Sequence, residues 1–246
     1  MQRRHFTLPS LAVGRDVNVL AFGHYGTPMI AFPSGGGQYF DFEDNGMVAA
    51  VAHLIEAGKL KLYCPESLDN ESWLRGDIDP HWKAVRHHAY QDFMTRDLVP
   101  AIRHDCNDSD IQIGLTGCSI GAFHAANFGL KFPHLFPYAL CMSGRYNVTA
   151  FGGRSDSSEV YFNNPLGYLP NLGGGDLEHV RHHAHIVLVC GQGAWEWKCL
   201  DDTHRLADTL HDKGISHERD IWGHDAEHHW HWWRKQFAHH LDRALS

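Results

Sequence analysis

The chain has 246 residues, of which 43% are hydrophobic and 20% are charged. A chain of this length and composition can bury a hydrophobic core without disulfides or a structural metal. The formal net charge is −8 and the acidic residues are spread along the chain, so we expect no nucleic-acid partner and no anionic membrane partner. Histidine is abundant, with 22 residues, and this raises metal binding as a hypothesis.

The cysteines and the N-terminal segment indicate the cellular compartment in which we expect the protein. The six cysteines are spread singly without a C-x-x-C pair, as expected for reduced thiols in a core. Residues 1–5 include the basic residues Arg3 and Arg4, but an alternating pattern follows them, and a signal peptide would need a continuous apolar segment there. No run approaches the roughly 18 apolar residues of a membrane span. We therefore expect a cytoplasmic protein, and the sequence leaves a homo-oligomer open.

The hydrophobic pattern predicts a hairpin and then repeated strand–helix units. Alternating runs at 6–11 and 17–22 flank a turn at 14–16, which is typical of a β-hairpin. Further strands are predicted at 29–32, 60–64, 111–118, 138–142, 186–190 and 218–222, and helices at 47–57, 81–104, 122–130, 202–213 and 229–245. This order predicts an α/β fold with a mostly parallel central sheet and helices on both faces.

We expect one domain over residues 1–246 without a large lid. The segment 143–185 is rich in glycine and asparagine and is predicted to be irregular. A segment of this kind inside a compact domain indicates an excursion near a functional site. In parallel sheets such sites gather at the carboxyl ends of the strands.

The most informative motif is Gly117-Cys118-Ser119-Ile120-Gly121, which matches G-x-S-x-G. An apolar strand is predicted before it and a helix of small residues after it, which is the context of a nucleophile elbow. In that strained turn the serine hydroxyl is exposed, and a side chain at either glycine would collide with its neighbours. A chance match in a glycine-rich chain is the alternative, and the flanking elements favour the elbow.

A serine needs a base, and the base an orienting acid, to attack a carbonyl group. Where an elbow of this kind operates, the acid follows a late strand and the histidine comes last. Glu196 lies in the loop after the strand at 186–190 and is the candidate acid. Asp201 and Asp202 are alternatives, although their position before a helical segment favours capping of that helix.

The candidate bases lie after the last predicted strand. This region contains His224, His228, His229 and His231. His229 and His231 are expected in the closing helix, and spacing alone does not choose between His224 and His228.

Two backbone amides are candidates for an oxyanion hole. One is the amide of Ile120, directly after the serine, and the other lies in the glycine-rich loop 34–37, at Gly36. A plain flexible turn would explain the same glycines. Aromatic residues that could wall a substrate pocket, each also a candidate for the core, are Tyr39, Phe40, Trp73, Trp195 and Trp230.

Together these motifs resemble the esterase D-like branch of the α/β-hydrolases, which includes S-formylglutathione hydrolases, feruloyl-type esterases and mycolyltransferases. The resemblance runs from residues 32–36 through 71–73 and 117–121 to 228–233. Members place the catalytic histidine in an H-x-W-x-x-W pattern, which His228, Trp230 and Trp233 match. The resemblance thus implies that His228 is the base.

The same resemblance bears on the acid and on the oxyanion hole. Glu196 follows a C-G-x-G turn at 190–193, as the acid does in mycolyltransferase-like members, and Gly36 stands where members donate the oxyanion amide. Two departures are visible. Many members have aspartate directly after the catalytic histidine, where this chain has His229, and many use an aspartate as the acid.

The resemblance implies an α/β-hydrolase fold and a serine-dependent carboxylic ester hydrolase that needs no cofactor. An acyltransferase with the same triad is the first alternative, and a catalytically inactive binding module on this fold is another. A histidine-rich metal-binding protein is the last, through His224 with His228 or through His182, His183 and His185. No H-E-x-x-H motif occurs, so we assign no metal ligands.

Overall fold

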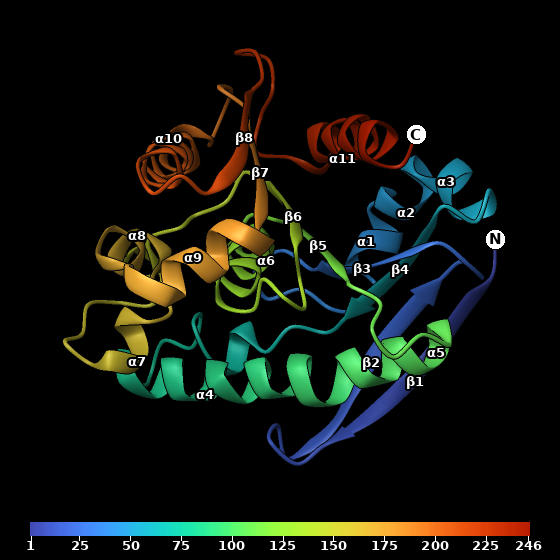
Figure 1. Cartoon of the computed structure of the whole chain (residues 1–246), viewed down its shortest axis with the longest axis horizontal. Coiled ribbons are helices and arrows are strands. Elements are labelled where there is room, and N and C mark those ends of the chain that lie inside the picture. The colour runs from blue at the N-terminus through green and yellow to red at the C-terminus, as the bar shows by residue number, and fades with distance from the viewer.

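The computed structural model describes all 246 residues, arranged around one eight-stranded sheet (Figure 1). The strand order is β1-β2-β4-β3-β5-β6-β7-β8. The strands are β1 (Arg3–Ser10), β2 (Arg15–Phe22), β3 (Thr27–Phe32), β4 (Leu60–Pro65), β5 (Gly114–Cys118), β6 (Tyr138–Met142), β7 (His185–Cys190) and β8 (Ser216–Ile221). β1 and β2 form an antiparallel hairpin, β2 pairs antiparallel with β4, and all other pairs are parallel. The predicted α/β fold with an N-terminal antiparallel hairpin is confirmed.

Helices cover both faces of the sheet (Figure 1). They are α1 (Asp41–Asp44), α2 (Met47–Ala50), α3 (Ala52–Glu56), α4 (Pro80–Asp92), α5 (Val99–Cys106), α6 (Ile120–Lys131), α7 (Ser158–Tyr161), α8 (Pro165–Tyr168), α9 (Gly174–His183), α10 (Trp197–Asp212) and α11 (Trp230–Ala244). Short 3-10 turns are η1 (Asp69–Glu71), η3 (Val148–Ala150) and η4 (Leu169–Asn171).

The alternation of side chains along the strands creates two cores. In β3, Ile30 and Phe32 join a core that includes side chains of α4, α6 and α10, whereas Met29 and Ala31 face a core with α1–α3 and α11. β3 is therefore buried on both faces, as expected for a central parallel strand covered by two helical layers.

Three predicted segments differ in detail from the structure. The helix expected at 47–57 is split into α2 and α3 at Val51. The helix expected at 81–104 passes from α4 into α5 through a π-helical turn, η2 (Phe93–Leu98), just before Pro100. Proline has no N–H and clashes with the carbonyl four residues earlier, so a widened turn accommodates it there. The segment 143–185, predicted to be irregular, contains α7, α8 and α9.

The parallel register brings distant loops to one edge of the sheet. The carboxyl ends of β3, β5, β6, β7 and β8 lie at this edge, because their strands run in the same direction. The segments that leave it are 33–37, the turn at Ser119, the turn at Ser143, the loop 191–196 and the loop 222–229. All candidate residues for nucleophile, acid, base and oxyanion hole therefore meet here.

Candidate active site

Ser119 occupies a sharp turn between β5 and α6. Its φ of 58° and ψ of −119° are strained for a residue with a side chain. A Cβ atom on Gly117 would lie 2.3 Å from the carbonyl carbon of Gly121, and one on Gly121 would lie 2.5 Å from the Pro33 oxygen. Both glycines of the motif are therefore required by close backbone packing.

Ser119, His228 and Glu196 form a continuous chain of polar contacts. His228 Nε2 lies 3.1 Å from Ser119 Oγ, and His228 Nδ1 lies 3.1 Å from Glu196 Oε2. The three residues come from the loops after β5, β8 and β7, and they are brought together only by the sheet. Such a geometry lets one imidazole accept a proton from the hydroxyl while the carboxylate holds its other nitrogen.

The other histidines of this region lie outside the chain of contacts. His224 and His231 are exposed, and His229 is the N-cap of α11, where its Nδ1 accepts the His231 backbone N–H. The geometry thus favours His228 over His224 as the candidate base, a choice that spacing alone leaves open.

Glu196 is completely buried, and three side chains contact its carboxylate. Besides contacting His228, it accepts a 2.5 Å hydrogen bond from Ser143 Oγ at Oε1 and a 3.5 Å contact from Cys190 Sγ at Oε2. Ser143 Oγ in turn accepts the indole N–H of Trp233 at 2.9 Å. Hydrogen bonds to both oxygens fix the orientation of the carboxylate towards His228.

A second thiol, that of Cys199, lies beside the candidate base His228. Cys199 Sγ is 3.8 Å from His228 Nδ1. Burial and the charge of Glu196 raise the pKa of Cys199 to about 12, and burial also raises the pKa of Cys190. Both thiols are therefore protonated at neutral pH and add no negative charge next to the carboxylate.

Sequence reasoning missed Ser143 altogether. Its only local signal is its place directly after a buried strand at the carboxyl edge of the sheet. Ser143 has a φ of 52°, and its hydroxyl links the candidate acid to α11. Neither property can be read from one sequence.

The alternative acids do not reach His228, and their expected capping role is wrong. Helix α10 begins at Trp197, so both aspartates lie inside it. Asp202 is buried and accepts hydrogen bonds from Arg145 Nε and the Tyr146 backbone N–H, both at 3.0 Å. Asp201 is exposed. Asp202 therefore holds the loop after β6 in place.

The loop with the second candidate oxyanion donor lies next to Ile120. A Cβ atom on Gly35 would be 3.7 Å from Ile120 Cγ2. The loop closes with a hydrogen bond from the Gly37 N–H to the Ser34 oxygen at 2.9 Å. Gly36 has a φ of +71°, which favours glycine.

The five aromatic residues proposed for the pocket have different environments. Trp73 is a core residue with no exposed surface, whereas Trp195 is 81% exposed. Tyr39 stacks on His5 and contacts Phe40, and Trp230 packs edge-on against Trp233 and Phe42. None of these five residues lines either of two cavities of about 900 and 540 Å³.

Two groups of side chains bring three potential metal ligands close together. Their ligand atoms lie within 4.8 Å of one another in the sets Glu196, Cys199 and His228, and Asp220, His239 and His240. The first set coincides with the candidate active site. The predicted sets, His224 with His228 and His182 with His183 and His185, are not among them.

The sequence profile of the family described as "Putative esterase" matches residues 42–244. The chain belongs to this esterase family. No curated protein sequence matches it. The fold is similar to that of a ferulic acid esterase, with a TM-score of 0.77, 17% identity, and 99% of this chain and 98% of the other covered.

Two further solved structures share the fold of this esterase. One is an S-formylglutathione hydrolase from Agrobacterium tumefaciens, with a TM-score of 0.74, 12% identity, and 99% and 95% of the two chains covered. The other is the Staphylococcus aureus fluorophosphonate-binding serine hydrolase FphF, with a TM-score of 0.74, 13% identity, and 100% and 98% covered. The match to the family described as "Putative esterase" confirms the predicted membership of the esterase D-like branch. Among the helices, none combines the length and the apolar character that crossing a membrane requires.

Proposed function

We propose that this esterase hydrolyses a carboxylic ester through an acyl-enzyme on Ser119, with His228 as the base and Glu196 as the acid that orients it. The observation that carries the proposal is the chain of two 3.1 Å contacts from Ser119 Oγ through His228 to Glu196. Family membership gives the reaction class, and the geometry supports these residues in their roles.

In the first half of the reaction Ser119 Oγ attacks the ester carbonyl carbon while its proton passes to His228 Nε2. The carbonyl oxygen becomes an oxyanion, which the backbone N–H groups of Ile120 and Gly36 stabilise. When the tetrahedral intermediate collapses, His228 returns the proton to the leaving alcohol, and the acyl group stays on Ser119.

In the second half a water molecule takes the place of the alcohol. The water oxygen attacks the acyl carbon while His228 accepts a proton from the water. His228 then returns this proton to Ser119 Oγ, and the free acid leaves. Glu196 accepts the Nδ1–H of His228 throughout and stabilises the imidazolium that forms. Ser143 supports this role because its hydroxyl donates to the carboxylate oxygen that does not face His228.

Hydrolysis is favoured over acyl transfer by the esterase family assignment. Transfer would use the same acyl-enzyme with an alcohol in place of water. An assay with an acceptor alcohol present distinguishes the two, since hydrolysis releases the free acid and transfer releases a new ester.

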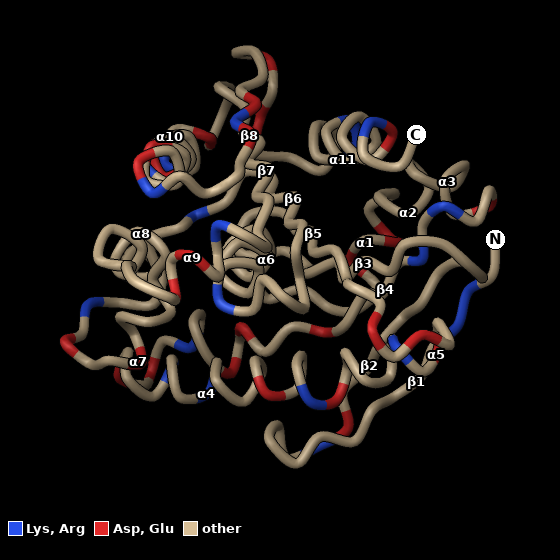
Figure 2. The backbone as a smooth tube through the Cα atoms, in the orientation of Figure 1, with Lys and Arg blue, Asp and Glu red and all other residues tan.

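We expect a small-molecule ester as substrate and no nucleic-acid partner. Lys and Arg are scattered over the elements and do not gather on one of them (Figure 2). We place the protein in the cytoplasm, because all six cysteines are free and five of them are buried.

The test is a series of p-nitrophenyl esters from acetate to long acyl chains, with a feruloyl ester and S-formylglutathione included because structural neighbours carry those names. Ser119→Ala is expected to lower kcat/KM by a factor of about 10⁴ or more, without unfolding the protein. His228→Ala should cause a comparable loss, whereas the matched variant His224→Ala should retain activity. Wild-type protein that is as inert as Ser119→Ala on every ester would refute the proposal.

A further inference from the structure

The loop 66–74, which follows β4, lies against the glycine loop that follows β3. The two loops are neighbours because β3 and β4 are parallel and end at the same edge of the sheet. The exposed residue Asn70 makes the contact, since its Nδ2 donates to the Gly36 carbonyl oxygen at 3.3 Å. A Cβ atom on Gly36 would lie 3.0 Å from Asn70 Oδ1, so the amide group of Asn70 rests on the glycine itself.

The glycine loop needs such a support. Residues 34–37 form a turn in which the Gly37 N–H bonds the Ser34 oxygen and the third residue, Gly36, has a φ of +71°. This combination is that of a type II turn, in which the orientation of the central amide depends on the dihedral angles of its two central residues. Here both central residues are glycines, whose backbone is the least restricted. A hydrogen bond that holds the Gly36 carbonyl therefore limits how far the neighbouring amide can rotate.

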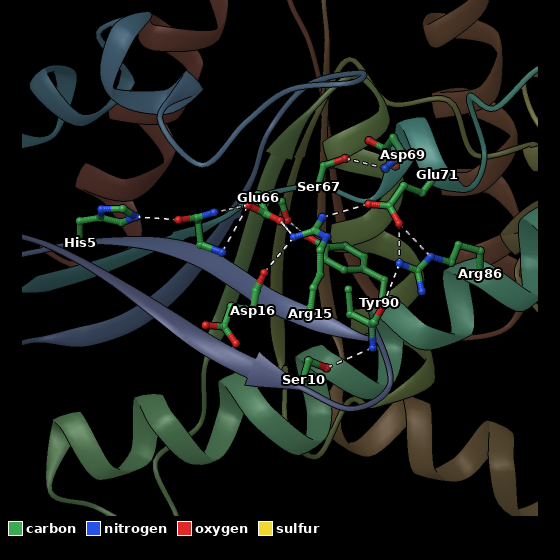
Figure 3. Close-up of polar contacts among 12 residues, drawn as sticks. His5, Ser10, Arg15, Asp16, Glu66, Ser67, Asp69, Glu71, Arg86 and Tyr90 are labelled. Carbon is green, nitrogen blue, oxygen red and sulfur yellow. Dashed lines mark hydrogen bonds and ion pairs between the residues drawn. The ribbon is translucent and has the colours of Figure 1, made fainter.

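The outer side of loop 66–74 is anchored by an ion-pair network (Figure 3). Arg15 of β2 pairs with Glu66 and, at 2.9 Å, with Glu71, and Arg86 of α4 pairs with Glu71 from the other side. Glu66 also accepts the side-chain N–H of Asn18 at 2.8 Å, so its carboxylate is held from two directions. The network joins the loop to the β1–β2 hairpin and to α4.

The inner side of the loop is anchored to the nucleophile helix. Asp69 Oδ1 lies 2.8 Å from Nε2 of His124, a residue of α6, and both side chains are only 1% exposed. Ser67 Oγ accepts the Asp69 backbone N–H at 2.9 Å (Figure 3). Because α6 begins directly after Ser119, this contact ties the loop to the helix that carries the Ile120 amide.

We propose that Asn70 is a positioning residue, which sets the distance between the two oxyanion donors by holding Gly36 at a fixed place relative to Ile120. Its neighbours Asp69 and Glu71 are bound to α6 and to the Arg15–Arg86 network, so the backbone of Asn70 is fixed from both sides. The inference rests on the proposed ester hydrolysis, in which the Gly36 amide receives the oxyanion. Asn70 itself acts through Gly36 and needs no contact with the substrate.

The test compares Asn70→Ala with Asn70→Asp, which keeps the shape but cannot donate a hydrogen bond to a carbonyl oxygen. We expect Asn70→Ala to lower kcat about tenfold with KM changed less than about twofold, since misplacing one donor costs less than removing it. Asn70→Asp should lose at least as much. Inhibition by a trifluoromethyl ketone, which forms a tetrahedral oxyanion on the serine, should weaken by the same factor as kcat/KM.

Asn171→Ala is the matched control. Asn171 is also exposed, and its Nδ2 also donates to a glycine carbonyl, that of Gly167 at 3.4 Å, but in the α8–η4 region. It should retain wild-type kcat and wild-type inhibition. Wild-type kcat in Asn70→Ala, full activity in Asn70→Asp, or an equal loss in Asn171→Ala would overturn the assignment of Asn70 while leaving ester hydrolysis intact. An inactive wild-type protein would instead overturn the proposed function, and this inference with it.

Discussion

The proposed nucleophile, Ser119, and the proposed acid, Glu196, lie at the same edge of the sheet but are held there by different means. Ser119 is presented by its immediate neighbours, because Gly117 and Gly121 allow a backbone approach that no side chain could share. Glu196 is held by residues far away in the sequence, with Ser143 on one carboxylate oxygen and His228 on the other. The first arrangement depends on close backbone packing at the two glycines of the motif, and the second on hydrogen bonds between side chains of separate loops.

Backbone strain is concentrated in the same region. Four residues other than glycine have a positive φ, and Ser119, Ser143 and Trp195 among them lie at the carboxyl edge of the sheet. The fourth, Asn107, ends α5, where a left-handed residue is ordinary. Strained residues persist where the surrounding structure holds them, and they often mark a functional site.

The largest effect expected from this comparison is a catalytic loss in Glu196→Gln. The amide keeps the shape of the side chain but no longer carries the charge that stabilises the imidazolium and selects its tautomer. We expect kcat/KM to fall by about 10³ to 10⁴ with the fold retained, as measured by ester hydrolysis and by thermal unfolding.

Two further variants serve as comparisons for Glu196→Gln. Ser143→Ala should cost far less activity, since it removes only one of the hydrogen bonds that orient Glu196. Asp201→Asn, a change at an exposed carboxylate of α10, should have no effect. An active Glu196→Gln enzyme would remove Glu196 from the mechanism.

The next effect is a loss of stability, and it tests whether the turn at Ser119 depends on close packing at its glycines. Gly117→Ala places a methyl group 2.3 Å from the Gly121 carbonyl carbon, so β5 and α6 must separate. We expect a loss of about 3 kcal/mol in the free energy of unfolding, together with most of the activity. Urea unfolding followed by circular dichroism measures the first quantity.

Gly175→Ala is the matched control, because a methyl group at Gly175, in the first turn of α9, meets no atom within 4 Å. It should be neutral or stabilise the protein by about 0.5 kcal/mol. Equal stability of the Gly117 and Gly175 variants would show that the elbow tolerates a side chain.

This contrast explains how far the sequence could predict the site. The elbow could be predicted because its glycines and the flanking apolar strand are adjacent in the chain. The choice of His228 over His224 needed a family resemblance, since their spacing is uninformative and only the fold places one of them 3.1 Å from Ser119. Ser143 and Asn70 could not be predicted, because their roles arise from contacts between separate loops.

The fold was predictable for a similar reason. Hydrophobic periodicity reports burial on a sheet or a helix face, and the strands and the hairpin followed from it. Helix boundaries were less accurate. Glu196 ends up as the N-cap of α10 because this helix starts at Trp197, several residues before the periodic apolar pattern begins.

The smallest effect concerns the stability of the protein in acid, which we expect to depend on His87, a residue of α4 that packs against α6. His87 is fully buried against the rings of Phe128 and His124, and neither of its nitrogens has a hydrogen-bond partner. Burial, reinforced by the neighbouring His124 and Lys131, lowers the pKa of His87 well below its usual 6.5. The folded protein therefore holds His87 neutral under conditions where the unfolded chain binds a proton.

Stability should thus fall with pH from about 6.5 downwards, by at most about 1.4 kcal/mol per pH unit for this one residue. His87→Phe keeps a ring against Phe128 but cannot be protonated, so its free energy of unfolding should decline less between pH 6.5 and 5. Urea titrations at several pH values measure the difference, with the exposed His104→Gln as control. Identical slopes for wild type and His87→Phe would place the acid sensitivity elsewhere, with the loops at the carboxyl edge of the sheet as the next region to test.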